Sequence, residues 1–405
     1  MKRQPARLLL ALLLFLIAAL PAAEPPAFFS EIGAIEAGLA NITGLSFTRT
    51  VPYGVLNKDQ LRAFLDERIK KALKPADVRA EELTLKMLGL IPPDFDLRQN
   101  TVDLLTEQAA AFYDYNKKKL FILQGASGGI EERTALVHEL AHALADQHFH
   151  LAKYIREGAR SDDGSTARLA VMEGQATWLT WAYVSKRNGG KAEVSKETIE
   201  KLTDNSSTDG ADFPVFAKEP LYLRESLVFP YDEGMKFQDA VYHKLGRKSF
   251  DEIFNRPPRS TRQILHPADY LEDEKPVDVD PPSLDKKQFH VINDGSVGEF
   301  DHSMLLRQFV PEKEGRAAAS HWRGGAFRLY EHKKEKYPVL AYASEWSTPA
   351  AAREVFTLYQ RVMKGKWKTM KVTERASDHV FGTGDSGKFE LRISGTRVTS
   401  IEGLR

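Results

Sequence analysis

Residues 134–144 constrain this chain most, because they set two histidines and a glutamate into an apolar helical pattern. His138 and His142 stand four residues apart, and at about 100° per residue their imidazoles project from nearly the same helix face. Such a pair can bind one metal ion, and Glu139 follows closely enough to polarise a metal-bound water. Alternatively, both histidines simply pack or contact solvent. The apolar positions predict a buried stripe beside the pair: Leu136, Leu140 and Leu144.

Length and composition predict a globular protein of two domains. A chain of 405 residues exceeds one average core, and 42% hydrophobic with 28% charged residues is ordinary for globular proteins. The formal net charge is +1, and it becomes −2 without residues 1–23, which hold three basic residues and no acidic one. This balance argues against a nucleic-acid partner.

Residues 1–23 have the pattern of an export signal. Lys2, Arg3 and Arg7 precede a 13-residue apolar stretch at 8–20, and small residues follow it. That stretch spans only about 20 Å as a helix, which is short for a bilayer crossing. We therefore expect a periplasmic or secreted protein without a stable membrane span after signal removal, an uncleaved N-terminal anchor being the alternative. The chain has no cysteine, so disulfides and a lipidated N-terminal cysteine are excluded.

Helices and one hairpin are expected ahead of the histidine pair. Residues 109–113 and 120–123 are short apolar or aromatic runs around a polar turn, which predicts a β-hairpin. In zinc peptidases with this helix motif, an edge strand commonly lies over the cleft and pairs with an extended substrate. The alternative is that the hairpin only completes the domain's sheet. Helical periodicity upstream begins at Asn57 and continues at 76–88 and 94–107.

A catalytic zinc needs a third protein ligand, and His148 is the first candidate. It follows His142 at the spacing of the metzincin pattern, in which a glycine turns the chain sharply after the second histidine. Ala145 occupies that glycine position here and favours a continuing helix, on which His148 points about 100° away. We therefore expect His148 to lie near the helix end or to support the metal ligands without binding the metal itself.

Glu173 is the second candidate, on the apolar side of a helix predicted for 166–183. A carboxylate there is costly unless it is paired or bound to metal. The neighbouring Gly174 costs about 1 kcal/mol of helix propensity, which is tolerable if another backbone or the metal must come close. We expect Glu173 to be the third ligand, the alternative being an ion pair with Arg168.

The helix motif, the segment around Glu173 and the preceding hairpin resemble gluzincin-type zinc metallopeptidases. More closely, the chain resembles a group of exported bacterial proteins regarded as metallopeptidases. That resemblance rests on the run His-Glu-x-x-His-Ala-Leu-x-Asp-Gln-His-Phe at 138–149 and on Pro-Pro-x-Ser-Thr-x-Gln-Ile-Leu-His-Pro at 257–267. It covers most of residues 105–270.

The resemblance implies a zincin-like domain with Zn²⁺ bound by His138, His142 and Glu173, and with Glu139 as the general base. One departure lies four residues after the third ligand. An aspartate that orients a zinc histidine is frequent there, whereas this chain has Thr177. A threonine hydroxyl can accept from an imidazole N–H, but it carries no charge.

Peptide hydrolysis by this chemistry also needs a donor for the tetrahedral oxyanion. Tyr231, Arg259 and His266 are the candidates, and we expect His266 or Tyr231 to face the zinc. For each residue the alternative is a structural role in packing against the catalytic helices. The tripeptide ending in Tyr231 contains a proline and predicts a break between helices at 220–227 and 234–245.

The remaining sequence predicts a linker and a second domain. Residues 272–286 are rich in Asp, Glu and Pro, which is typical of an extended linker. They separate a mainly helical metallopeptidase domain at 24–271, with 24–105 as its helical N-terminal part, from a small accessory domain at 287–405. Helical and alternating patterns in 287–405 predict an α+β domain, so the fold class is α+β throughout.

Two functions fit this pattern. The first is a zinc-dependent endopeptidase acting on peptides or proteins outside the cytoplasm, in which Glu139 activates a zinc-bound water. The second is a non-catalytic exported binding or scaffold protein on a peptidase fold, with structural or absent metal. The intact His138, Glu139 and His142 favour the first function. No feature of the sequence predicts an oligomeric state.

Overall fold

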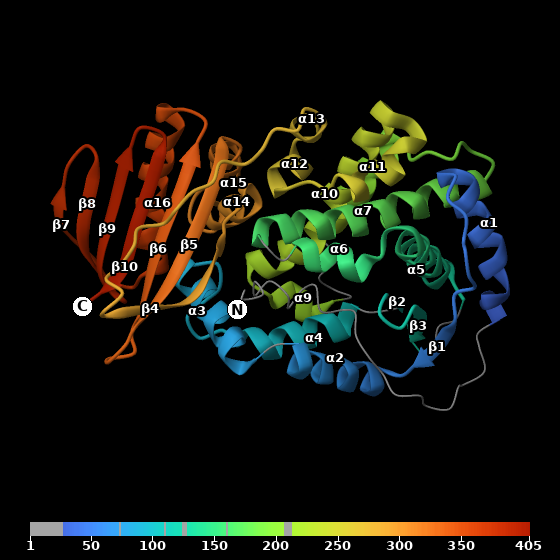
Figure 1. Cartoon of the computed structure of the whole chain (residues 1–405), viewed down its shortest axis with the longest axis horizontal. Helices are drawn as coiled ribbons and strands as arrows, with labels where there is room; N and C mark the ends of the chain where they lie inside the picture. Colours follow the sequence, from blue (N-terminus) through green and yellow to red (C-terminus); the bar gives the residue numbers. More distant parts are fainter. Residues whose placement is uncertain (1–26, 73, 109–110, 124–127, 159–160, 206–212) are drawn as a thin grey trace.

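The chain folds into a helical region followed by an antiparallel sheet domain, as Figure 1 shows. The computed structural model describes residues 27–72, 74–108, 111–123, 128–158, 161–205 and 213–405. The predicted export signal at 1–23 lies outside these residues. Within the described ranges, no helix is both long and apolar enough to cross a membrane. The predicted α+β class is confirmed.

Residues 27–271 form mostly helices, at the right of Figure 1. Three long ones, α5, α7 and α10, occupy its centre, and shorter ones surround them. The helices are η2 (Ala27–Glu31), α1 (Ile32–Thr43), α2 (Lys58–Ala72), α3 (Pro75–Leu88), α4 (Leu97–Gln108), α5 (Ile130–Phe149), α6 (Leu151–Gly158), α7 (Asp162–Arg187), α8 (Lys196–Asn205), α9 (Pro214–Lys218), α10 (Leu221–Leu245), η3 (Gly246–Lys248), α11 (Ser249–Asn255), α12 (Thr261–Leu265) and α13 (Pro267–Leu271).

A three-stranded sheet lies beside α5. The predicted hairpin is confirmed over 111–123, because β2 (Ala111–Asp114) pairs antiparallel with β3 (Lys119–Leu123), while residues 109 and 110 of the prediction lie outside the described residues. The third strand, β1 (Tyr53–Leu56), pairs parallel with β3 and was not predicted. The strand order is β1-β3-β2, so β2 is an edge strand of this sheet. The rings of Phe64 on α2, Phe112 and Phe121 stack in succession and attach α2 to the hairpin.

Helices α7 and α10 approach each other closely at two glycines. A Cβ on Gly174 would lie 2.1 Å from the carbonyl carbon of Gly234, and a Cβ on Gly234 would lie 2.2 Å from the carbonyl oxygen of Ala170. The sequence allowed two reasons for a glycine at position 174, the close approach of another backbone or of a metal. The structure shows that it is the backbone of Gly234 that comes close. The predicted break near Tyr231 is wrong. Pro230 lies inside a continuous α10, whose packing against α7 outweighs the roughly 3 kcal/mol cost of an internal proline.

The C-terminal domain is one antiparallel sheet with the strand order β4-β5-β6-β10-β9-β8-β7 (Figure 1, orange to red). Helix α16 packs across β6, β9 and β10, and its buried apolar residues include Val355, Phe356, Tyr359, Val362 and Met363. The sequence did not predict β4 or β8. The elements are β4 (Phe289–Ser296), α14 (Glu299–Arg307), α15 (Glu312–Ala319), β5 (Trp322–His332), β6 (Pro338–Trp346), α16 (Pro349–Lys366), β7 (Met370–Arg375), β8 (His379–Gly384), β9 (Gly387–Ser394) and β10 (Arg397–Leu404).

The two regions are joined by direct contacts as well as by the linker. Residues 272–286 contain no helix or strand, and the backbone N–H of Val277 donates to Arg323 on β5 over 2.7 Å. At the start of α7, Asp163 Oδ1 accepts from Thr261 of α12, whose Oγ1 accepts from the N–H of Phe300 on α14. These hydrogen bonds hold the sheet domain against the amino end of the helix that carries Glu173.

Candidate metal centre

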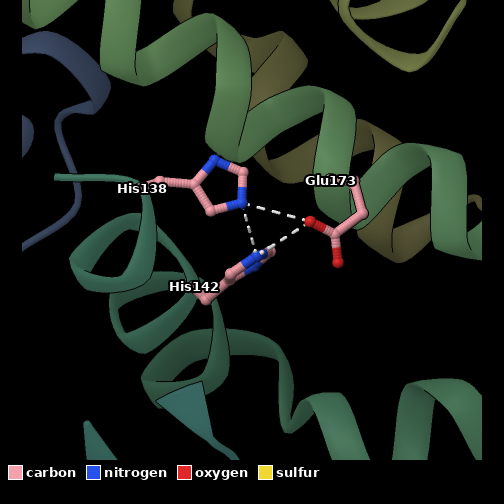
Figure 2. A group of neighbouring side chains, drawn as sticks. All are labelled: His138, His142 and Glu173. Atoms are coloured by element: carbon pink, nitrogen blue, oxygen red, sulfur yellow. Dashed lines mark hydrogen bonds and ion pairs between the residues drawn. The ribbon is translucent and has the colours of Figure 1, made fainter. Parts of the chain in front are cut away.

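Three side chains from two helices converge on one point, as Figure 2 shows. His138 and His142 project from α5, and Glu173 projects toward them from α7. The Nε2 atoms of His138 and His142 lie 3.0 Å apart, and Glu173 Oε2 lies 3.1 Å from the first and 3.2 Å from the second. The side chains are 10 to 15% exposed, so the group is mostly buried but keeps some contact with solvent.

Local sequence explains the position of the histidine pair on α5. Leu136, Leu140 and Leu144 are at most 1% exposed and form the predicted buried stripe. Because this stripe is anchored in the core, the adjacent face of α5 points toward α7. The opposing helix, α7, is capped by Ser161, whose hydroxyl accepts from the N–H of Gly164, and its close crossing with α10 at two glycines sets its position.

The three side chains create a field that suits a cation. Burial alone would raise the pKa of Glu173, but the charge of His142 and hydrogen bonds from both histidines hold this pKa well below the usual carboxyl range. Burial lowers the pKa of His142, but the facing Glu173 carboxylate outweighs that effect and raises it to about 9. The carboxylate is therefore ionised and faces a position where positive charge is favoured.

The spacing of the three atoms fits a bound zinc ion. Bonds of 2.0–2.1 Å in a tetrahedral arrangement place neighbouring ligand atoms about 3.3 Å apart. The observed separations of 3.0–3.2 Å are close to this value. Two imidazole nitrogens and one carboxylate oxygen are also a donor set that zinc accepts. These residues can hold a metal.

Glu139 points from α5 to the edge of the small sheet. Its Oε2 accepts a hydrogen bond from the backbone N–H of Tyr113 on β2 over 2.7 Å. Burial raises the pKa of Glu139, an effect that the two histidines partly oppose. A carboxylate with a raised pKa beside the histidine pair has the properties of a general base.

Tyr231, on α10, is brought to the same site. Its ring stacks on His138 with the centroids 5.8 Å apart, and its side chain hydrogen-bonds with Glu173. Burial, together with the nearby carboxylates of Glu173 and Glu139, raises the pKa of the Tyr231 hydroxyl well above 10. The hydroxyl therefore keeps its proton at neutral pH and can donate it in a hydrogen bond.

His266 and Arg259 have partners at the junction of the two regions instead. His266 Nε2 lies 2.8 Å from Glu299 Oε1 on α14, and Arg259 lies 3.4 Å from Asp273. Among the described residues, neither makes a hydrogen bond or ion pair with the three converging side chains. The run at 257–267 thus joins the domains, and Tyr231 is the predicted oxyanion donor that the structure brings to the site.

Of the two candidates for the third ligand, Glu173 lies beside the histidine pair and His148 does not. Helix α5 continues through Ala145 as predicted, and His148 Nε2 lies 2.9 Å from the carbonyl oxygen of Ser46, away from the histidine pair. Arg168 does not pair with Glu173; it donates to the carbonyl of Tyr154 and lies over that residue's ring.

Thr177 does not accept a hydrogen bond from either histidine, which was the role that its sequence position suggested. Its buried Oγ1 has no hydrogen-bond partner among the described residues, so no hydroxyl contact with a ligand imidazole is seen. The orientation of the histidines therefore depends on α5 itself and on its neighbours.

Sequence reasoning missed two contributors, Tyr113 and Asp146. Tyr113 acts through its backbone N–H, a group that every residue except proline carries and that leaves no mark in a sequence. Asp146 did leave a mark, since it stands four residues after His142 in the run at 138–149 and therefore shares its helix face. It is fully buried on α5.

Comparisons with known proteins add little to this geometry. The family described as "Domain of unknown function (DUF8575)" matches residues 287–405, the range of the predicted accessory domain. A crystal structure from Chloroflexus aurantiacus, described as a candidate hydrolase with a novel fold, is similar over 67% of this chain and 98% of that chain, with 19% identity and a TM-score of 0.37. A search of curated proteins found no match. A TM-score this low supports neither a fold nor an activity for this chain.

Proposed function

We propose that this chain is a zinc-dependent endopeptidase that acts outside the cytoplasm. The observation that carries the proposal is the convergence of His138, His142 and Glu173, with Glu139 adjacent on the same helix. The export pattern of residues 1–23 supports the location.

Each side chain has a distinct task in this proposal. Zinc, when bound, polarises a carbonyl group and lowers the pKa of water to about 7. Glu139 takes a proton from the attacking water and passes it to the leaving amine. Tyr231, protonated at neutral pH, donates a hydrogen bond to the oxyanion that forms on the substrate carbonyl.

The edge strand β2 favours a peptide as the substrate. It ends the sheet order, so its outer edge is not paired with another strand of that sheet. An extended peptide can add to such an edge through backbone hydrogen bonds. Because the N–H of Tyr113 on β2 reaches Glu139, a peptide lying along this edge would run past the general base.

The test compares zinc content and cleavage of casein and a broad peptide library by the wild type and Glu139→Gln. We expect both proteins to hold one zinc per chain and the variant to lose at least about 100-fold in turnover, as befits a general base. Glu131→Gln, an exposed change in the first turn of α5, is the matched control and should keep full turnover. Stoichiometric zinc without Glu139-dependent cleavage would instead favour a binding or scaffold protein with structural metal.

A further inference from the structure

Asp146 is a fully buried carboxylate that binds three groups at once. It accepts hydrogen bonds from the Tyr113 hydroxyl at 2.9 Å, from Lys118 Nζ at 2.7 and 2.6 Å, and from the N–H of Leu151 at 3.0 Å. Tyr113 and Lys118 both belong to the hairpin of β2 and β3, whereas Leu151 begins α6. Asp146 therefore ties the hairpin to the carboxyl-terminal half of α5.

Tyr113 is bound to α5 at two points. Its hydroxyl reaches Asp146, and its backbone N–H reaches Glu139 Oε2 at 2.7 Å. Glu139 and Asp146 are seven residues apart, which places them two turns apart on one helix face. One residue of β2 thus bridges two turns of the helix that carries the histidine pair.

Lys118 completes this attachment from the turn of the hairpin. Its backbone has φ of 56°, a left-handed conformation that is uncommon for a residue with a side chain. The side chain is 31% exposed, but its ammonium group meets the fully buried Asp146. A charged acceptor and two charge-assisted contacts make this a stronger attachment than a neutral hydrogen bond.

We propose that Tyr113 is a positioning residue for the general base. Asp146 and Lys118 fix the ring of Tyr113, the ring fixes the place of its backbone N–H, and that N–H orients the Glu139 carboxylate. This rests on the proposed function, in which Glu139 moves the proton, and it adds Tyr113, Lys118 and Asp146, which are not among the proposed metal ligands. A misplacement of about 1 Å at a reacting group can cost up to 100-fold in rate, so a loose hairpin should slow turnover.

The test uses Tyr113→Phe, which removes the hydroxyl and keeps the ring. The matched control is Tyr154→Phe, because the hydroxyl of Tyr154 is also buried but has no hydrogen-bond partner among the described residues. Lys118→Met and Lys118→Arg form a second pair, the arginine preserving the charge that meets Asp146. Intact sites are counted by zinc content and by titration with a zinc-chelating inhibitor.

Two readouts are required. The first is kcat per intact site, which we expect to fall about tenfold in Tyr113→Phe and Lys118→Met, with zinc content unchanged. Tyr154→Phe and Lys118→Arg should stay within about twofold of the wild type. The second is hydrogen exchange of residues 111–115 in the metal-free protein, which should accelerate in Tyr113→Phe and in Glu139→Ala because both weaken the hold on the Tyr113 N–H.

Unchanged kcat per intact site in Tyr113→Phe would overturn the proposal, whatever the exchange rates show. Slower turnover with unchanged exchange would also overturn it, because the ring would then act by another route. If the wild type shows no Glu139-dependent cleavage, the proposed function fails separately, and unchanged exchange in both variants would still reject the positioning contact.

Discussion

The helical region and the sheet domain each contain a cluster of buried polar side chains, and the two clusters are built differently. In the sheet domain, Glu402 Oε1 accepts from Tyr359 at 2.7 Å and from Ser400 at 3.0 Å, while its Oε2 accepts from Lys366 at 2.6 Å. Lys366 also donates to the carbonyl of Met87 on α3 over 2.7 Å. Every charge in this cluster meets its opposite within the protein.

The other cluster consists of side chains that can act as metal ligands. Two imidazole nitrogens and a carboxylate oxygen face one another within 3.2 Å, and no lysine or arginine pairs with them among the described residues. A buried ion pair is costly to break once it has formed, whereas two histidines and a carboxylate can turn their lone pairs to an external cation when the histidines are neutral. Removing one member of each cluster should therefore have different consequences.

The largest expected effect is on metal binding in Glu173→Gln. The amide lacks the charge of the carboxylate and binds zinc poorly, so zinc affinity should fall by more than about 100-fold. This exceeds the usual loss when a residue that only hydrogen-bonds to a metal ligand is replaced. Turnover should be lost with the metal. Chelator competition and zinc analysis measure the affinity. A variant that retains zinc as tightly as the wild type would remove Glu173 from the ligand set.

Glu402→Gln tests the opposite cluster. It leaves the Lys366 ammonium buried without a carboxylate, and breaking such a pair costs about 3–5 kcal/mol of unfolding free energy. We expect this loss in urea unfolding of the whole chain, with zinc content unchanged. Glu390→Gln is the control, since Glu390 pairs with Arg392 at the surface, where an ion pair contributes less than about 1 kcal/mol. Equal effects of the two substitutions would contradict the proposed difference.

Gly174→Ala probes how the ligand helices are held together. The new Cβ would overlap the backbone of Gly234, which cannot move aside as a flexible side chain would, so we expect a loss of about 3 kcal/mol in stability. Weaker zinc binding should accompany it, because α7 carries Glu173. Gly33→Ala, on α1 with no atom within 4 Å of the added carbon, should cause neither change. Thermal unfolding and zinc analysis of both variants decide the matter.

The smallest predicted effect concerns Glu219, away from both clusters. Burial, with the nearby carboxylates of Asp103 and Glu107, raises its pKa to about 6. A raised folded-state pKa favours the protonated form, so the contribution of Glu219 to stability is fully present below pH 4.5 and is lost as pH rises through 6. Glu219→Gln should therefore be more stable than the wild type by about 1 kcal/mol at pH 8, with the difference vanishing near pH 4.5. Urea unfolding at the two pH values tests this sign.

Where a prediction depended only on local periodicity, the predicted element agrees with the structure. His138, Glu139 and His142 needed only a helix, and Leu136 with its repeats provided one. The hairpin needed only two short runs and a turn. By contrast, β1 pairs with β3 across more than 60 residues, and such a contact has no local pattern that could predict it.

Two residues, Pro230 and His266, show where local reasoning ended. Pro230 predicted a helix break, but the packing of α10 against α7 overrides an intrinsic preference of a few kcal/mol. His266 was a reasonable donor by residue type, but its partner Glu299 comes from the next domain. Residue type limits the chemistry that a side chain can perform, whereas the packing of distant segments determines which groups that side chain meets.

The sequence by itself determined which face of α5 could bind a metal, the chemistry of the side chains there and the α+β class, because these depend on residue identity and on the repeat of a helix or strand. The tertiary structure alone decided that Glu173 lies within 3.2 Å of both histidines, that Tyr231 stacks on His138 and that Tyr113 holds Glu139. Each of these contacts joins separate elements. Their distances follow from packing at Gly174 and at Asp146, which no local repeat encodes.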